Sequence, residues 1–292
     1  MNTLSSNDKL LMVVNPIAGG TNKDPYVDQV KKAANDNYQL KTYFTTGEND
    51  EQSIKDSIDE FEPDRILVMG GDGTIKLVAG IVSNKIPIAV LPAGSANGLA
   101  TDLEIPMKES EAIEVAIGTN SMLIDTLFIN GELGLHISDI GLNAELIREY
   151  DGGTIRGHLG YAIKVIPTLW KSDTPCKFNI TTTEKTQEIE AVMVAFANSK
   201  KFGTGVTVNP DGEMNDGYFE VIIFKNLNAI DVVKTLMGSI PLDSEFVEII
   251  KTQEVIVKAD RPVSFQIDGE YCDQQSEVKA SILPDNLCIV VP

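Results

Sequence analysis

The hydrophobic pattern of the first 120 residues alternates between apolar runs and amphipathic segments. It predicts strands at 10–15, 39–46, 65–70 and 86–92. It predicts helices at 25–36, 50–61, 74–83 and 109–118, with a further short helix from about residue 95. Apolar strands that alternate with helices are typical of a parallel sheet covered on both faces. We therefore expect residues 1–120 to form an α/β doubly wound domain.

The pattern changes near Asn120, where short runs of alternating or β-branched residues begin. These runs predict strands within 177–183, 188–198, 217–225, 246–251, 254–259, 262–268, 276–283 and 287–292. Turn residues separate them at intervals typical of antiparallel sandwiches. Two helices are expected among the strands, at 157–170 and 227–238. Residues 121–292 should therefore form a β-sandwich-like, mainly antiparallel domain. The last strand of this domain can return to the first domain.

Composition limits the class of protein and of partner. Hydrophobic residues make up 42% and charged residues 23%, which is typical of a soluble globular protein. The net charge of −19 argues against nucleic acid as a partner, because binding phosphates requires a basic surface. The three separated cysteines suggest neither a disulfide framework nor a zinc site, and no segment approaches the ~18 apolar residues of a spanning helix. We expect a cytoplasmic protein.

Three turns rich in glycine, asparagine or serine each follow an apolar strand and precede a helix. They are NPIAGG (15–20), GGDGT (70–74) and PAGSANGLA (92–100). Glycine lets main-chain N–H groups approach an anion, and the start of a helix favours negative charge. None of the turns is a Walker P-loop or a dinucleotide fingerprint. Together they predict a site for nucleotide phosphates, although GGDGT alone also fits an ordinary tight turn.

The ordered set of motifs resembles the diacylglycerol kinase and sphingosine kinase family of lipid kinases, in the form of a bacterial soluble diacylglycerol kinase-like protein. The resemblance continues through 141–147, 156–161, 198–205, 209–223 and 268–270. It implies a nucleotide-binding α/β domain followed by a β-rich domain for lipid binding and catalysis. It also implies that the γ-phosphate of ATP is transferred, with Mg²⁺, to a hydroxyl of a diacylglycerol-like or sphingoid lipid in the cleft between domains.

The resemblance further implies roles for individual residues. Asp72 and Glu270 would be catalytic, and Glu270 would be the general base that takes the proton of the lipid hydroxyl. The nucleotide site would comprise Asn15, Gly70, Gly71, Asp72, Gly73, Thr74, Gly94, Ser95 and Asn97. Asp216 would coordinate magnesium, and Asp125 would support the metal site.

Two features leave parts of this interpretation open. Many family members have aspartate after the asparagine of the third turn, where this chain has Gly98. The third turn resembles the sphingosine kinase branch, whereas GGDGT resembles the diacylglycerol or bacterial lipid kinase branch, so the acceptor is either a glycerolipid or a sphingoid lipid. The Asp-Gly pairs at 216–217 and 268–269 also match hairpin turns with solvated acids. The functional roles of Asp216 and Glu270 therefore rest on the order of the family motifs and not on local spacing.

Two other functions fit parts of the sequence. NAD kinases also have GGDGT at the nucleotide phosphates, but we expect a second turn with Asn-Glu there instead of PAGSANGLA. A nucleotide- or lipid-binding regulator without turnover is the non-enzymatic alternative, and the intact Asp72, Asp216 and Glu270 argue against it. The only histidines, His136 and His158, are expected to be structural.

Segment 155–172 is the candidate for membrane contact. It contains no acidic residue and three cations, namely Arg156, Lys164 and Lys171. Apolar residues recur along it at helical spacing and end at Trp170. A basic amphipathic helix can rest on an anionic membrane, although such a stripe can equally pack on its own domain. We expect a lipid substrate at a membrane surface and transient peripheral association, and the oligomeric state is open, a homodimer included.

Overall fold

The computed structural model describes residues 4–5, 7–34, 37–82, 84–141, 175–202, 206–207, 209–225 and 246–292. The chain divides into two compact units. The first comprises Met1–Ile124 and Asp285–Pro292, and the second comprises Asp125–Pro284. Both divisions fall inside a strand, β5 (Ser121–Ile129) and β16 (Glu270–Val290), so the boundary expected at residue 120 lies just before β5.

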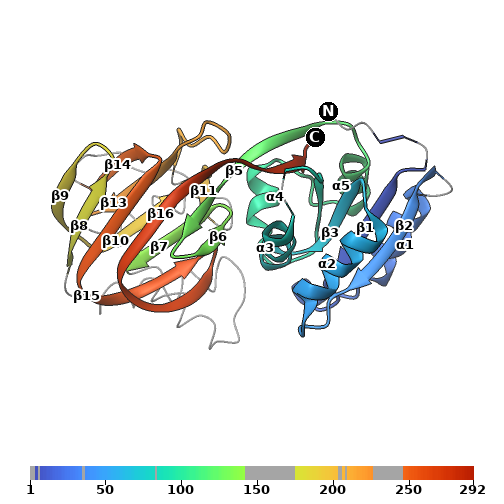
Figure 1. The fold of residues 1–292 in the computed structure, drawn as a ribbon, viewed down its shortest axis with the longest axis horizontal. Coiled ribbons are helices and arrows are strands. Elements are labelled where there is room, and N and C mark those ends of the chain that lie inside the picture. Colours follow the sequence, from blue (N-terminus) through green and yellow to red (C-terminus); the bar gives the residue numbers. More distant parts are fainter. Residues whose placement is uncertain are drawn as a thin grey trace. The chain divides into compact units, whose positions relative to one another are not determined.

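The first unit is built on a parallel sheet (Figure 1). Its strands lie in the order β4 (Ile88–Pro92), β3 (Arg65–Gly70), β1 (Lys9–Val14) and β2 (Gln39–Phe44). The end of β16 joins the sheet beside β4, where Ile289 pairs with Ile88 in parallel. Almost every position of β1, β3 and β4 is buried, which explains why these runs are apolar throughout.

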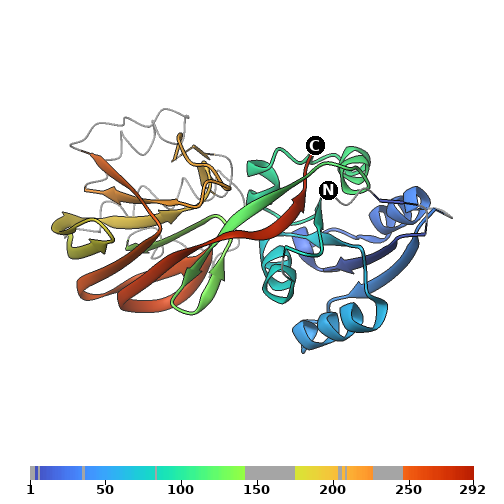
Figure 2. The ribbon, with the colours of Figure 1, turned by 45° about the horizontal axis from the view of Figure 1, so that its top comes forward.

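Helices cover both faces of this sheet (Figure 2). On one face, α1 (Asp24–Ala34) and α5 (Glu109–Ala116) contact each other and share a buried cluster with alternate residues of β1, such as Leu10 and Met12. The helices α2 (Asp50–Phe61) and α3 (Asp72–Ile81) contact each other, and they contact β1 and β3 respectively. Shorter helical segments, η1 (Ala18–Gly20) and α4 (Gly98–Asp102), follow β1 and β4. The expected doubly wound α/β unit is confirmed.

The second unit is rich in strands, which are mainly antiparallel. Its principal order is β14-β13-β10-β7-β15-β16; β8 pairs with β15 and β9 with β8, whereas β5 pairs with β16 and β6 with β5. The bounds are β6 (Glu132–Gly134), β7 (Ile137–Gly141), β8 (Cys176–Thr182), β9 (Thr186–Ala191), β10 (Met193–Ala197), β13 (Phe219–Phe224), β14 (Val247–Thr252) and β15 (Glu254–Ile267). The strands β11 (Lys201–Phe202) and β12 (Val206–Thr207) form a separate two-stranded sheet.

Both faces of the strands β7, β10 and β13 are buried. Phe196 and Val221 belong to a large cluster on one face, whereas Ala195 and Ile222 belong to a smaller cluster. Because neighbouring residues of a strand point to opposite faces, the two clusters lie on opposite sides of these strands. The expected β-sandwich-like, mainly antiparallel fold is confirmed.

Several strands differ from the expectations. The run 188–198 is divided into β9 and β10, whereas 254–259 and 262–268 form the single strand β15. A register shift between Lys258 and Val263 lets β15 continue past the polar residues that had suggested a break. The strand β16 likewise continues through Pro284, and the pattern predicted no strands at 121–141, where β5, β6 and β7 lie.

The helices expected at 157–170 and 227–238 lie outside the described residues, as does the candidate membrane segment 155–172. Among the helices that the structure describes, none is long and apolar enough to cross a membrane.

Candidate functional site

Three loops of the first unit leave the carboxyl ends of neighbouring strands. They follow β4, β3 and β1, which are adjacent in the sheet. From β1 the chain continues to β2 on one side, whereas β3 and β4 lie on the other side. The order of the strands therefore reverses between β1 and β3, and doubly wound sheets bind ligands at such a point.

Glycines allow the main chains of these loops to touch. A Cβ atom on Gly94 would lie 2.4 Å from the Cα of Gly71, and one on Gly19 would lie 2.7 Å from the carbonyl oxygen of Ala93. The N–H of Ala93 donates a hydrogen bond of 2.9 Å to the carbonyl of Gly70. The glycine at position 94 is therefore required by packing of main chain against main chain.

Asp72 connects the second loop with the third. Its carboxylate oxygens accept hydrogen bonds from the N–H groups of Gly98, at 2.9 Å, and Leu99, at 3.0 Å. These donors lie at the start of α4, where N–H groups have no acceptor within the helix. Asp72 thus caps α4 from a different part of the chain, and its expected contact with ATP stays a prediction.

Asn15 and Asn97 hold the other parts of the loops in place. The side-chain amide of Asn15 donates to Thr74 Oγ1 at 3.0 Å, and its carbonyl accepts the N–H of Ile17 at 3.2 Å. Asn97 has a left-handed backbone with φ of 54° and exchanges hydrogen bonds of 2.8 and 3.1 Å with the main chain of Gly94. Asparagine tolerates this conformation better than most residues. Both asparagines therefore shape the loops.

The start of α3 offers main-chain N–H groups to an anion. Gly71 precedes the helix, and no side chain caps it. Asp72 and Gly73 occupy the first positions of α3, whose N–H groups have no acceptor within a helix. Gly73 is exposed, as is Ser95 in the third loop. A helix start of this kind beside glycine-rich loops suits a phosphate group.

We expect Asp72→Ala to lower the free energy of unfolding by about 2 kcal/mol, because the N–H groups of Gly98 and Leu99 lose their acceptors. Chemical denaturation without nucleotide measures this effect. The exposed Asp59→Ala, in α2, is the control and should change stability by less than about 0.5 kcal/mol. An unchanged denaturation midpoint for Asp72→Ala would show that the carboxylate does not hold the loops together.

In the second unit, a tight hairpin presents Glu270. Asp268 and Gly269 connect β15 to β16 with φ angles of 53° and 88°, as a type I′ turn requires. The carboxylate of Asp268 is not simply solvated, because it accepts the N–H groups of Leu135 at 2.8 Å and His136 at 3.0 Å. Glu270, the first residue of β16, is exposed.

The buried Asn198 connects residues 135 and 136, which hold the hairpin through Asp268, to Asp125. Its side-chain amide donates to the carbonyl oxygen of Leu135 at 3.3 Å and to that of Asp125 at 2.8 Å. Its own N–H donates to the carbonyl of His136 at 2.8 Å. Residues 125, 135–136, 198 and 268, which lie on separate strands or loops, therefore meet through hydrogen bonds.

Asp125 and Asp216 hold the same turn. The buried carboxylate of Asp125 accepts the N–H of Gly217 at 2.7 Å, and the N–H of Asp125 donates to the carbonyl of Met214 at 2.6 Å. Asp216 accepts the N–H of Tyr218 at 2.9 Å. Hydrogen bonds thus connect Asp125 with the turn that contains Asp216, and through Asn198 with residues 135–136, whose N–H groups hold Asp268 two residues before Glu270.

The residues around Asp216 do not fit the expected magnesium site. One carboxylate oxygen of Asp216 accepts a main-chain N–H, and the other pairs with the ammonium group of Lys251. Among the described residues there is no group of three His, Cys, Asp or Glu side chains that could hold a metal ion. Mg²⁺ requires nearly octahedral oxygen coordination. Asp125 is likewise used by the turn, so both carboxylates of the expected pair already have partners within the protein.

Sequence reasoning assigned no role to Asn198, Glu220 or Lys251. Asn198 lies in a motif that carried the resemblance, but its partners are visible only in the fold. Glu220 is buried and accepts the side-chain amide of Asn209 at 2.6 Å, and burial raises the pKa of its carboxyl group. Within the described residues, the buried Oδ1 of Asn198 and the buried hydroxyl of Ser138 have no hydrogen-bond partner. Such groups are rare and often mark functional regions.

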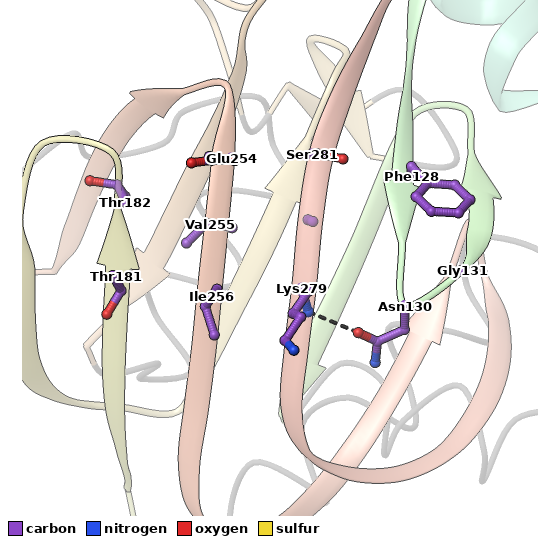
Figure 3. Close-up of a pocket in the computed structure, with 11 residues that line it drawn as sticks. Phe128, Asn130, Gly131, Thr181, Thr182, Glu254, Val255, Ile256, Lys279 and Ser281 are labelled. Atoms are coloured by element: carbon purple, nitrogen blue, oxygen red, sulfur yellow. Dashed lines mark hydrogen bonds between the residues drawn. The ribbon is translucent and has the colours of Figure 1, made fainter.

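A hollow of about 420 Å³ lies elsewhere in the second unit (Figure 3). Strands β5, β8, β15 and β16 line it, with Phe128 and Ile256 among its apolar residues. At its edge, Asn130 Oδ1 accepts the main-chain N–H of Lys279 at 2.8 Å, which Figure 3 shows as a dashed line. None of the residues of the Asp268–Asn198–Asp125 network lines this hollow.

Comparison with known proteins identifies the family. Residues 9–129 match the diacylglycerol kinase catalytic domain, and residues 139–291 match the YegS C-terminal NAD kinase beta sandwich-like domain. A diacylglycerol kinase of Bacillus subtilis strain 168 is 26% identical over 273 residues, which cover 89% of each chain.

Solved structures share the fold. One of a diacylglycerol kinase from Bacillus anthracis strain Sterne has a TM-score of 0.74 at 19% identity and covers 98% of this chain and 97% of its own. An NAD kinase from Archaeoglobus fulgidus, solved with ATP, has a TM-score of 0.56 at 12% identity and covers 96% of this chain and 93% of its own. With both of its units matched in order, the chain belongs to the diacylglycerol kinase and YegS-like family of lipid kinases.

Proposed function

We propose that this protein transfers the γ-phosphate of ATP to a hydroxyl of a glycerolipid or sphingoid lipid. The observation that carries the proposal is the set of three glycine-rich loops joined by Asp72 and Asn15. Phosphoryl transfer depends mainly on positioning and on electrostatic stabilisation of the transferred group. Loops held by main-chain contacts beside the start of α3 suit the first of these tasks, and membership of a lipid kinase family supports the assignment.

Glu270 is the proposed general base. It is exposed at the start of β16, directly after a turn whose conformation Asp268 holds. A carboxylate can take a proton when it lies within ~2.6–3.2 Å of the reacting hydroxyl. The proposal therefore requires that the lipid hydroxyl reach Glu270 while the γ-phosphate is held by the glycine-rich loops.

Magnesium is proposed only as a companion of ATP. Mg²⁺ keeps several waters and often binds through the phosphates of its substrate rather than through an all-protein cage. No step of the proposal uses a metal ion held by Asp216 or Asp125, because those carboxylates are used by the turn that they share.

NAD kinase activity is the second candidate, favoured by the shared fold with the Archaeoglobus fulgidus enzyme. The third loop argues against it, because the loop continues from Ser95 through Asn97 to Gly98 without the Asn-Glu turn expected of NAD kinases. A regulator that binds nucleotide or lipid without turnover is the remaining alternative. Contact with a membrane stays part of the proposal.

The deciding experiment incubates the full chain with radiolabelled ATP, Mg²⁺, extracted membrane lipids and NAD in parallel reactions. We expect label in the organic phase, and mass spectrometry of that product identifies the acceptor lipid. Label in NADP instead would favour the second candidate. Binding of ATP without transfer to either acceptor would favour a regulator and would contradict the proposed activity.

A further inference from the structure

The turn at residues 214–218 places a carboxylate where a cation can bind. Asp125 fixes the turn from outside by accepting the N–H of Gly217. The side chain of Asp216 is 19% exposed, so it is largely removed from water. One of its oxygens accepts the N–H of Tyr218, and a mostly buried carboxylate needs a further partner for its charge.

Lys251 supplies that partner from the neighbouring strand. Its Cα lies opposite that of Glu220 in the β13–β14 pairing, and its ammonium group binds the remaining oxygen of Asp216. The same nitrogen lies 5.4 Å from the centroid of the Tyr218 ring, within the range of a cation–π contact. Strand register and ring contact thus both hold the ammonium group at this carboxylate.

The surrounding acids explain why a positive charge is favourable here. The hydrogen bond that Lys251 donates to Asp216 is the largest cause that raises the pKa of Lys251, and the charges of Glu220 and Glu213 add to it. Glu220 is 5% exposed and lies on the strand that follows the turn. The ammonium group therefore neutralises a local excess of negative charge.

We propose that the ammonium group of Lys251 is the resident cation of this turn and occupies the place at Asp216 that the family resemblance gives to a magnesium ion. An ammonium group offers three donors and one charge without any demand for octahedral coordination. With Lys251 in place, the Asp216–Lys251 pair has no net charge that would attract a divalent ion. This inference concerns the described turn alone and does not depend on the proposed kinase activity.

The test measures Mn²⁺ binding to the full chain without nucleotide. Binding is detected as a loss of the electron paramagnetic resonance signal of free Mn²⁺. Wild type and Asp216→Asn should bind Mn²⁺ equally weakly, because Lys251 already occupies the carboxylate. Lys251→Met should bind one Mn²⁺ about tenfold or more tightly than wild type, because a competing unit charge is removed. Adding Asp216→Asn to Lys251→Met should abolish that gain.

Two controls make the result specific. Lys251→Arg keeps the positive charge and should behave like wild type. Lys258→Met removes a lysine that pairs with Glu277 at 3.1 Å on other strands, and it should leave Mn²⁺ binding unchanged. The inference is overturned if wild type binds a single Mn²⁺ more tightly than Asp216→Asn, a comparison that does not depend on the stability of Lys251→Met. It is equally overturned if Lys251→Met gains no affinity.

Discussion

Glu270→Gln should lower kcat for lipid phosphorylation by on the order of 10²-fold or more, because glutamine cannot take the proton of the acceptor hydroxyl. The substitution keeps the size of the side chain, and Glu270 is exposed, so the fold should be unaffected. The affinity for ATP should be nearly unchanged, since the proposal assigns the nucleotide to the loops of the first unit. Single-turnover kinetics with saturating lipid, together with calorimetric titration of ATP, measures the two effects separately.

Asp273→Asn is the matched control for this experiment. It removes a negative charge from the same strand three residues later, and Asp273 is also exposed. Asparagine tolerates the left-handed backbone at this position, where φ is 65°. The control should retain activity. Equal losses of activity in both variants would show that the loss comes from the removed negative charge and not from a missing base. Full activity of Glu270→Gln would remove Glu270 from the mechanism.

Gly94→Ala should weaken ATP binding by about tenfold or more and lower the free energy of unfolding by about 1–3 kcal/mol. The added Cβ would lie 2.4 Å from the Cα of Gly71, and neither main chain can yield without moving its loop. The clash would also disturb Asn97, whose Oδ1 would lie 2.9 Å from the same Cβ. Calorimetric titration of ATP and denaturation with urea give the two quantities.

Gly80→Ala is the control for Gly94→Ala, and we expect it to raise stability instead of lowering it. Gly80 is exposed within α3, and a Cβ there would have no neighbour within 4 Å. Alanine should stabilise the helix by roughly 0.5–1 kcal/mol and leave ATP binding unchanged. If Gly94→Ala bound ATP as well as Gly80→Ala does, the close approach of the loops would have no part in nucleotide binding.

The first unit could be predicted because its information is local. Strands such as β3 are buried at every position and read as uninterrupted apolar runs, and each glycine-rich turn lies between a strand and a helix. By contrast, β5 was missed because Asp125 and Thr126 interrupt its apolar run. Both are buried, and the partners of Asp125 in the turn at 214–217 are distant in sequence.

The same difference between local and distant partners applies to the candidate site. The positions of the loop residues follow from the motifs, but the hydrogen bonds of Asp72 lead to Gly98 and Leu99 in the next loop. Lys251 is a single lysine in an ordinary strand pattern, and its partner Asp216 lies 35 residues earlier. Only the pairing of β13 with β14 brings them together.

The first unit is interrupted in sequence by the whole of the second. Its sheet needs the end of β16 beside β4, where Leu287, Ile289 and Val290 are fully buried. A nascent chain therefore cannot complete this sheet until the ribosome has also translated residues 125–284. Until then the edge of β4 remains open to mispairing with other strands, so the first unit depends on the later half of the chain for its maturation.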